Sequence, residues 1–592
     1  MQQFRRLSKQ SFAFLSNKNT ELIVFLLLAL ANGFYLVMYK YIPSLDGPQH
    51  LYNSNVIVEL VKGNDFFKQF FQINNVLVGY WNAHAVLSLY NFIFPSWLAE
   101  KLFLLTTLTL IPFSFRYLIK IINPNAGYLP ILILPFVTNS YFFMGYYAFC
   151  FAWIFFFFTI GYFIKNYSEF SKIRKLIILC FLLFLTFLSH MIIFSFTLSV
   201  IALYLIYRFI CDIIKKETKT KYALLSHVKL ATRILISAIP SIIFAIIYSL
   251  HVFELNKDLN TSSFASSDLL SQFVNISSLV AFNHKSEGIM NSQLFIFVMA
   301  LGLISLIFVI INSKKKSLLS KNHIYNIIFW GLLSLLVLIL FFIFPNSFGT
   351  GSVSKRILVF FYFVFVAWIA MNRLPAIVHL IIIIAVIWYG YNQTVVRHPY
   401  YDKIDHLISE LVEAEDTMRV NTTFTAINCI PLWNNWHYPC YIGSEKPIVY
   451  LKSPQNMGHF PVVWNWEKMP TNYLGLYKSG EAGTSWFNGS INKTIRPIDY
   501  VVVYGNWVFN NKAEYKKLKT IIETFYNLVL VSERGTVALY EFKLYDYLEA
   551  KIPEIESNEK WMAQIKTKAE IRKLSVENML LLDAIYYYTR TH

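Results

Sequence analysis

Long apolar segments constrain this chain more than any other feature of its sequence. A helix needs about 20 mostly apolar residues to cross a bilayer. Windows of that kind begin at Glu21, Trp97, Tyr128, Tyr147, Leu176, Met191, Thr232, Leu294, Asn326, Ile357 and Ala376. Only 15% of the 592 residues are charged, whereas a soluble domain carries about 25%. We therefore predict a polytopic α-helical membrane protein of about eleven spans, which excludes a soluble globular enzyme.

Short basic clusters between the apolar windows set the expected orientation. They lie at residues 5–18, 116–120, 165–175, 215–233, 314–321 and at Arg373. All of them fall on one side of the membrane only if the run 176–210 forms a hairpin of two short helices that turns near His190. The amino terminus is then cytoplasmic in an inner (plasma) membrane, and the first span is a retained signal anchor. Because the net charge of +18 resides mainly in these clusters, it indicates topology and not nucleic-acid binding.

The composition changes after residue 391, where charged residues, Pro and Gly appear throughout. The patterns predict an amphipathic helix over 405–415, a strand over 499–505, a helix followed by a strand over 517–533, and a strand over 536–542. We expect a transmembrane module over 1–391 with an outer loop at 40–96, an extracytoplasmic (periplasmic) soluble α/β domain over 392–545, and a helical tail over 546–592.

The first outer loop carries the leading candidate for chemistry. Asp46 follows the first span by a few residues, Gly47 and Pro48 bend the chain, and His50 lies within one further turn. A carboxylate held by a turn near an imidazole suits a general base or a metal ligand. The alternative is an Asp N-cap with Pro in the first turn of a juxtamembrane helix.

A later outer loop carries a candidate phosphate site. Gly349 and Gly351 permit close backbone approach, and Lys355 with Arg356 lies in the first turn of the next helix. Free N–H groups, the helix dipole and two cations together favour a lipid phosphate head group as ligand. The alternative is that the two cations extend to the membrane interface, as basic side chains at span ends often do.

Three further polar residues are candidates for substrate contact. Asn82 and His84 close the first loop beside Trp81, where they can line a sugar pocket or belong to an interfacial aromatic belt. His190 lies at the expected tip of the hairpin, where an ionisable group near a membrane cavity indicates a functional site. A structural histidine is the alternative there.

Several motifs are missing, and the five cysteines form no metal-ligand spacing. The sequence contains no P-loop, no HExxH and no GxSxG element. Cys429 and Cys440 share one Trp-rich segment and can form a disulfide in an oxidising compartment; two free buried thiols are the alternative.

The acidic residue just after the first span, the long outer loop, the many further spans and the carboxy-terminal α/β domain together resemble the GT-C superfamily. These membrane glycosyltransferases use polyprenyl-phosphate sugar donors and include protein O-mannosyltransferases and the lipid A aminoarabinose transferase. The segment 94–120 is similar to the second span of those proteins. The sequence departs from many members, which carry an adjacent Asp–Glu pair in the first loop, because Gly47 follows Asp46 here.

The resemblance implies a glycosyltransferase in which Asp46, with His50 as its partner, takes the proton from the acceptor hydroxyl or orients it. Arg356, supported by Lys355, would hold the donor phosphate. The implied partners are a polyprenyl-phosphate-linked sugar, a glycan, lipid or protein acceptor, and membrane lipids. No cofactor is certain, and a divalent cation, if one takes part, would have Asp46 as its ligand. A flippase of lipid-linked saccharides and a surface-polysaccharide polymerase or ligase remain as alternatives.

Overall fold

The computed structural model describes residues 18–214, 220–255, 266–314, 321–344, 347–348, 351–430, 435–453, 458–474, 477–482, 494–505 and 513–591. The chain divides into two compact units. We call the first the membrane unit; it comprises Met1–Ile42, Val76–Ala83 and Lys101–Asp402. We call the second the polar unit; it comprises Pro43–Asn75, His84–Glu100 and Lys403–His592. Gly349 of the candidate phosphate site lies outside the described residues.

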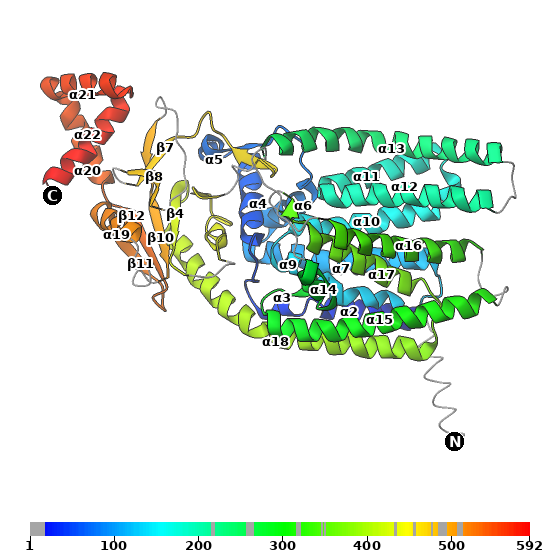
Figure 1. The fold of residues 1–592 in the computed structure, drawn as a ribbon. Coiled ribbons are helices and arrows are strands. Elements are labelled where there is room, and N and C mark those ends of the chain that lie inside the picture. The colour runs from blue at the N-terminus through cyan, green and yellow to red at the C-terminus, as the bar shows by residue number, and fades with distance from the viewer. Residues whose placement is uncertain are drawn as a thin grey trace. The chain divides into compact units, whose positions relative to one another are not determined.

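Within the described residues, eight helices are long and apolar enough to cross a membrane. They are α7 (Ser96–Ile122), α10 (Tyr147–Lys165), α12 (Met191–Ile214), α13 (Thr220–Leu255), α15 (His284–Lys314), α16 (Lys321–Ile343), α17 (Val353–Ala370) and α18 (Ala376–Thr417). Helices α10 to α13 run side by side, as do α16 and α17 (Figure 1). Each of these eight helices coincides with an apolar window of the sequence. The predicted polytopic helical architecture is therefore confirmed.

The three remaining windows form shorter helices. The window at Glu21 becomes α2 (Lys18–Ala31), and the window at Leu176 becomes α11 (Ile173–Ser189). The window at Tyr128 is not one helix but a series of short pieces, namely η1 (Leu129–Ile133), α8 (Leu134–Val137) and α9 (Ser140–Phe143). Pro130 and Pro135 lie in this window, and a proline has no N–H for the helical ladder. In the described residues, the eleven expected windows thus correspond to eight long helices and three shorter apolar segments.

The expected hairpin near His190 is present. Helix α11 ends at Ser189 and α12 begins at Met191, so that His190 alone separates them. Both helices pack against α10 and α13. The 176–210 run is therefore two helices.

Two buried carboxylates join separate helices within the membrane unit. Glu21 of α2 accepts hydrogen bonds from Arg116 at 2.9 Å and from Lys120 at 3.0 Å, both near the end of α7. Glu287 of α15 pairs with Arg397 of α18 at 3.0 Å. Glu287 and Arg397 are 0% and 1% exposed. Buried charges are tolerated where they are paired and hydrogen-bonded, as these are.

The polar unit contains a five-stranded sheet with the order β11-β12-β10-β4-β5. Its strands are β4 (Thr422–Asn428), β5 (Ile448–Tyr450), β10 (Tyr500–Tyr504), β11 (Tyr526–Val531) and β12 (Val537–Phe542). Strand β4 pairs in parallel with β5 and β10, whereas β12 runs antiparallel to β10 and β11. Helix α19 (Ala513–Phe525) precedes β11. These elements match the predicted strands and the predicted helix-then-strand segment.

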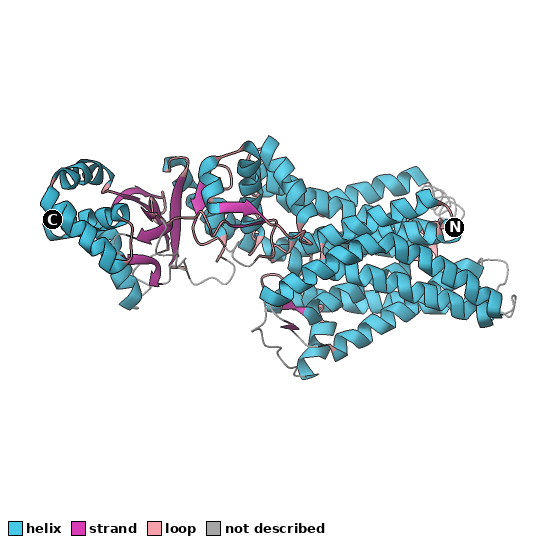
Figure 2. Ribbon diagram, turned by 90° about the horizontal axis from the view of Figure 1, so that it is seen from above, coloured by secondary structure: helices cyan, strands magenta, loops and turns pink. Residues whose placement is uncertain are grey.

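Smaller elements complete the polar unit; Figure 2 distinguishes its strands from its helices by colour. A three-stranded sheet holds β7 (Thr471–Leu474), β8 (Tyr477–Ala482) and β9 (Ile495–Pro497), and a two-stranded sheet pairs β1 (Phe71–Ile73) with β6 (Val462–Trp464). The first loop contributes α4 (Gly47–Lys62), α5 (Asp65–Phe70) and most of α6 (Trp81–Ile93). The tail consists of α20 (Tyr545–Ser557), α21 (Glu559–Arg572) and α22 (Val576–Thr591).

The first loop is built into the same unit as the carboxy-terminal sheet. The Tyr52 hydroxyl on α4 donates to the Ile448 carbonyl at 3.2 Å and accepts from the Tyr450 N–H at 2.8 Å. Phe71 stacks on Trp464 with ring centroids 4.6 Å apart. Helix α18 runs without a break across residue 391, where the sequence composition changes.

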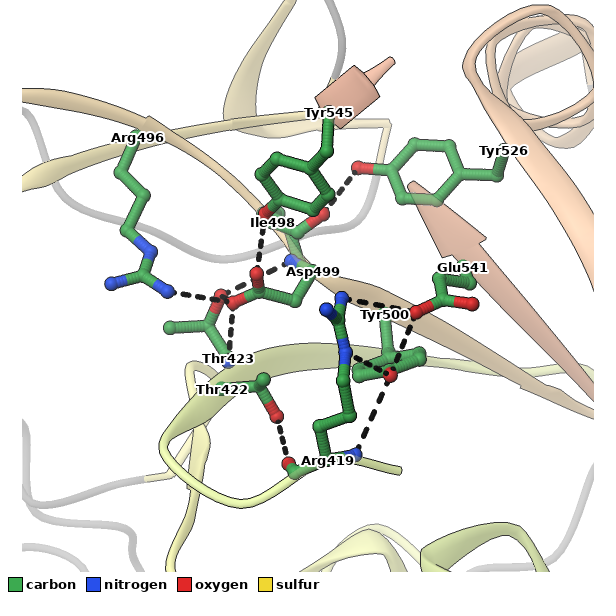
Figure 3. A network of polar contacts seen from close by, with 10 residues as sticks. All are labelled: Arg419, Thr422, Thr423, Arg496, Ile498, Asp499, Tyr500, Tyr526, Glu541 and Tyr545. Carbon is green, nitrogen blue, oxygen red and sulfur yellow. Dashed lines mark hydrogen bonds and ion pairs between the residues drawn. The ribbon is translucent and has the colours of Figure 1, made fainter. Parts of the chain in front are cut away.

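A buried aspartate ties β4, β9 and α20 together (Figure 3). Asp499, which is 3% exposed, accepts hydrogen bonds from the Thr423 N–H at 2.7 Å and the Thr423 hydroxyl at 2.8 Å. Arg496 donates to the same carboxylate at 3.2 Å, and the Tyr545 hydroxyl donates to its other oxygen. Each carboxylate oxygen is satisfied, so that this network holds the sheet and the tail in place.

Candidate functional site

Asp46 precedes α4, whose first turn contains Pro48, as the capping alternative predicted. The Asp46 side chain nevertheless makes no capping hydrogen bond. The Gly47 N–H donates instead to the Ser44 hydroxyl at 3.0 Å. The Asp46 carboxylate is left for another contact, and its Oδ1 lies 3.5 Å from Nε2 of His437.

Burial shifts the pKa values of Asp46 and His437 in opposite directions. It raises the pKa of Asp46 from 3.8 to about 7 and lowers the pKa of His437 from 6.5 to about 4, because a buried site disfavours the charged form of each group. At neutral pH His437 is therefore uncharged, and Asp46 exchanges its proton near neutrality. The two side chains are still 27% and 24% exposed, so that a ligand can reach them. These are the properties of a general base.

Two histidines of the polar unit form a second pair. Nδ1 of His50 lies 3.1 Å from Nε2 of His84, and both imidazoles pack edge-on against Phe460. His50 is joined to Asp46 through the backbone, because its N–H donates to the Asp46 carbonyl at 3.1 Å. The side-chain partner of Asp46 in the structure is His437, and the role of His50 as partner of Asp46 stays a prediction.

The expected divalent cation would need a set of ligands around Asp46. Among the described residues, no group of three or more His, Cys, Asp and Glu side chains could hold a metal ion. The expected cation therefore stays a prediction.

Arg356 of the membrane unit lies in an aromatic cage. Its guanidinium is 5.3 Å from the ring centroid of Tyr146, 5.6 Å from Tyr141 and 5.8 Å from Phe149. Its Nε is buried without a hydrogen-bond partner, and no carboxylate pairs with it in the part of the chain that the structure describes. Lys355 precedes it in the first turn of α17 and is half-buried. A caged cation without a counter-ion is suited to bind an anion.

His190 and Asn82 lie in the membrane unit, where they cap helices. The His190 Nδ1 accepts from the Ile192 N–H at 3.2 Å, and its ring packs on Phe149 at 5.3 Å. The Arg356 guanidinium lies 5.8 Å from the same Phe149 ring, so that His190 and Arg356 belong to one cluster. Asn82 donates to the Leu185 carbonyl at 2.7 Å and to the Ser189 hydroxyl at 2.9 Å, at the end of α11. These contacts favour the structural alternative for Asn82.

The structure thus forms two clusters from the predicted residues, one in each unit. His437 and Phe460 were not singled out from the sequence. They lie in Trp-, Asn- and His-rich segments whose composition suits carbohydrate contact but also ordinary packing. Cys429 and Cys440 are both free and buried, which corrects the disulfide alternative.

No protein-family model matches the chain, and no curated protein matches it. Among solved structures, the chain is similar to ArnT from Cupriavidus metallidurans bound to undecaprenyl phosphate, with 10% identity and a TM-score of 0.41, over 88% of this chain and 98% of that one. It is also similar to an Archaeoglobus fulgidus oligosaccharyltransferase in complex with Zn and sulfate, with 11% identity and a TM-score of 0.38, over 88% of this chain and 73% of that one. Both TM-scores lie below 0.5, and we therefore argue function from this chain's own residues.

Proposed function

We propose that this chain is an integral membrane glycosyltransferase. It moves a sugar from a polyprenyl-phosphate donor to a glycan, lipid or protein acceptor on the extracytoplasmic face of the inner membrane. The observation that carries the proposal is the Asp46 carboxyl group, which makes no capping bond, faces the neutral His437 and has a pKa of about 7. A structural N-cap has no need of a raised pKa.

Asp46 would act as the base. Its carboxylate takes the proton from the acceptor hydroxyl while the hydroxyl oxygen forms a bond to the anomeric carbon of the sugar. The bond between that carbon and the phosphate oxygen breaks, and the lipid phosphate leaves with the bonding electrons. Asp46 then releases the proton to water. A general base works best when its pKa is near the working pH, because about half of the molecules then carry the deprotonated carboxylate.

Arg356 would stabilise the departing phosphate. The leaving group gains negative charge, and preorganised cations lower the barrier for such a step. The rings of Tyr141, Tyr146 and Phe149 hold the guanidinium in place, which reduces the entropy lost on binding. Lys355 is a second cation in the same helical turn.

A lipid-linked donor fits the proposed topology. With the basic clusters in the cytoplasm, the polar unit that holds Asp46 faces the opposite side, where nucleotide sugars are absent. The eight long apolar helices among the described residues are also more than an anchor requires, so that a role in binding a membrane-resident donor accounts for them.

The test is Asp46→Asn in cells that carry only this variant, with the envelope glycans and glycolipids compared by mass spectrometry. We expect the loss of one sugar from the product while protein abundance and folding are unchanged. The matched control is Asp65→Asn, in the same unit, whose side chain is 91% exposed. A glycan profile unchanged by Asp46→Asn would refute the assignment. A flippase would carry the donor without needing a base and would show that result.

A further inference from the structure

A cavity of about 430 Å³ lies within the membrane unit, outside the clusters described above. Helix α2, the short helix α3 (Tyr35–Met38), α8 and α18 line it. Its walls are mostly apolar and include Leu28, Phe34, Val386 and Ile387. Neither a lysine nor an arginine is among the lining residues.

Two hydrogen-bond donors of this cavity have no partner. They are the Tyr35 hydroxyl and the Asn32 side-chain amide nitrogen, both buried and both without a hydrogen bond within the described residues. Tyr35 is only 6% exposed. A buried polar group left without a partner costs about 1–3 kcal/mol. The two buried donors therefore point to a ligand with an acceptor.

The depth of these donors along α2 restricts the kind of ligand. The charged cluster of Glu21, Arg116 and Lys120 marks one end of the bundle. At a rise of 1.5 Å per residue from Lys18, Asn32 lies roughly 21 Å and Tyr35 roughly 25 Å along the chain's path. The hydrocarbon core is about 30 Å thick. With Glu21 placed at one boundary of this core, both donors lie in its far half, toward the opposite boundary with its phospholipid ester groups.

We propose that this cavity binds one ester-linked diacyl phospholipid of the bilayer, with an acyl chain along the apolar walls and an ester carbonyl accepting hydrogen bonds from Tyr35 and Asn32. Two unpartnered donors in one mostly apolar cavity match the two lone pairs of a carbonyl oxygen. A polyprenyl phosphate offers no acceptor except its charged phosphate, for which the cavity provides no cation. The inference is independent of the proposed sugar transfer.

The test is native mass spectrometry of the purified full-length chain with dioleoyl phosphatidylglycerol and with its diether analogue, which has the same head group and no ester carbonyls. We expect the wild-type chain to retain one diester molecule about three- to tenfold more strongly than the diether, as one or two hydrogen bonds would give. Tyr35→Phe and Asn32→Ala should reduce retention of the diester to the level of the diether. Tyr128→Phe is the matched control, since its buried hydroxyl also has no partner in the described part of the chain but lies outside the cavity.

A blocking variant tests the cavity itself. Gly390 lines it, and a Cβ at this position would meet nothing within 4 Å. Gly390→Leu should therefore fill the space without a clash and abolish specific retention of the diester. Gly288→Leu adds the same volume on α15, also into open space, and should leave retention unchanged.

Three results would overturn the proposal: equal retention of diester and diether by the wild-type chain, full retention by Gly390→Leu, or displacement of the diester by equimolar undecaprenyl phosphate. Thermal unfolding in lipid-free detergent provides a second readout. Tyr35→Phe removes a donor that has no partner and should unfold at a temperature no lower than the wild type, while losing the stabilisation that added diester provides. A variant that unfolds at a lower temperature and keeps that stabilisation would contradict the assignment.

Discussion

Asp46 keeps its proton at pH values where most aspartates have lost theirs, because burial disfavours its carboxylate and no capping bond compensates. The nearest imidazole cannot compensate either, since burial also keeps His437 neutral. Burying this pair lowers the free energy of unfolding, and a purely structural residue would give no reason for that cost. The pair is therefore the one to which the proposed function gives a role.

This cost gives a pH dependence of stability with a definite sign. The pKa of Asp46 is about 7 in the folded chain and near 3.8 when unfolded, so that the folded state binds more protons between these values. The stability that protonated Asp46 contributes is present below about pH 4 and is lost as the pH rises through about 7. The Asp46→Asn variant has no ionisable group at this position and therefore does not lose this stability as the pH rises. Its melting temperature, measured by intrinsic fluorescence, should rise relative to the wild type between pH 4 and 7 and then level off.

The control for this experiment is again Asp65→Asn, the same substitution at an exposed side chain of the same unit. A flat difference for Asp46→Asn, or one that falls with rising pH, would show that Asp46 is not buried as described. Glu415 has a pKa raised to about 7 by burial as well and remains in both proteins, so that its contribution cancels.

Arg356 is the second residue with a direct test. Removing a charge-assisted contact to phosphate costs about 1.5–3 kcal/mol, which is roughly 10- to 100-fold in affinity. Arg356→Gln should weaken binding of undecaprenyl phosphate by that factor. Arg208→Gln is the matched control, because Arg208 also packs on two tyrosine rings, at 5.2 and 5.5 Å. Equal binding by wild type and Arg356→Gln would remove the phosphate role.

Asp46 and Arg356 could be named as candidates from the sequence, but His437 beside Asp46 and the aromatic rings around Arg356 could not. Spacing along the chain marks residues a few positions apart, whereas His437 lies hundreds of residues from Asp46. The capping alternative was correct about Pro48 and wrong about the carboxylate, since Pro48 offers no N–H to cap and Asp46 makes no capping hydrogen bond.

Among the elements, apolar length was a reliable predictor of helices and a poor predictor of their continuity. Hydropathy reflects side chains alone, whereas Pro130 and Pro135 interrupt a helix because their backbone has no N–H for its hydrogen bonds. The window at Tyr128 therefore breaks into three pieces. The strands were predictable because their apolar patterns are short and bounded by turn residues. The pairing of β4 with β5 and β10 could not be predicted, because parallel strands are not joined by a short turn that the sequence would show.

The turn before β5 depends on one glycine. Gly443 has φ +81°, and a Cβ there would lie 2.6 Å from the Ile448 carbonyl oxygen, a backbone atom that cannot move aside. Gly535 has φ +70° and open space around it. Gly535→Ala should cost about 1 kcal/mol from backbone strain alone, and Gly443→Ala roughly 2 kcal/mol more. Thermal unfolding of the full chain measures both, and equal melting temperatures would contradict the packing described.

For the whole molecule, the composition change at residue 391 was visible in the sequence, but the partnership of the first loop with the carboxy-terminal sheet was not. That partnership rests on contacts such as Tyr52 with Ile448 and Tyr450, which no spacing rule anticipates. The loop that carries Asp46 is thereby held by hydrogen bonds and packing within a folded unit. A catalytic carboxylate needs such support, because small displacements weaken proton transfer.

The orientation of the whole chain is a prediction of the basic clusters. We expect a cysteine placed at Lys560, on α21, to react with a membrane-impermeant maleimide added to intact spheroplasts. The wild-type chain, which has five cysteines of its own, provides the background; Cys150, Cys429 and Cys440 are buried. Labelling only after the cells are lysed would place the polar unit in the cytosol and contradict the topology.

Sugar transfer by the purified chain in lipid nanodiscs tests the proposed function most directly. The donor is the radiolabelled polyprenyl-phosphate-linked sugar fraction of the host, and the acceptor is membrane from a strain that lacks the gene. We predict that the wild type releases polyprenyl phosphate and labels the acceptor, at a rate that rises with pH through about 7. Asp46→Asn should be slower by about 10²–10⁴-fold, as expected when a general base is lost. Transfer by Asp46→Asn at the wild-type rate would contradict the account.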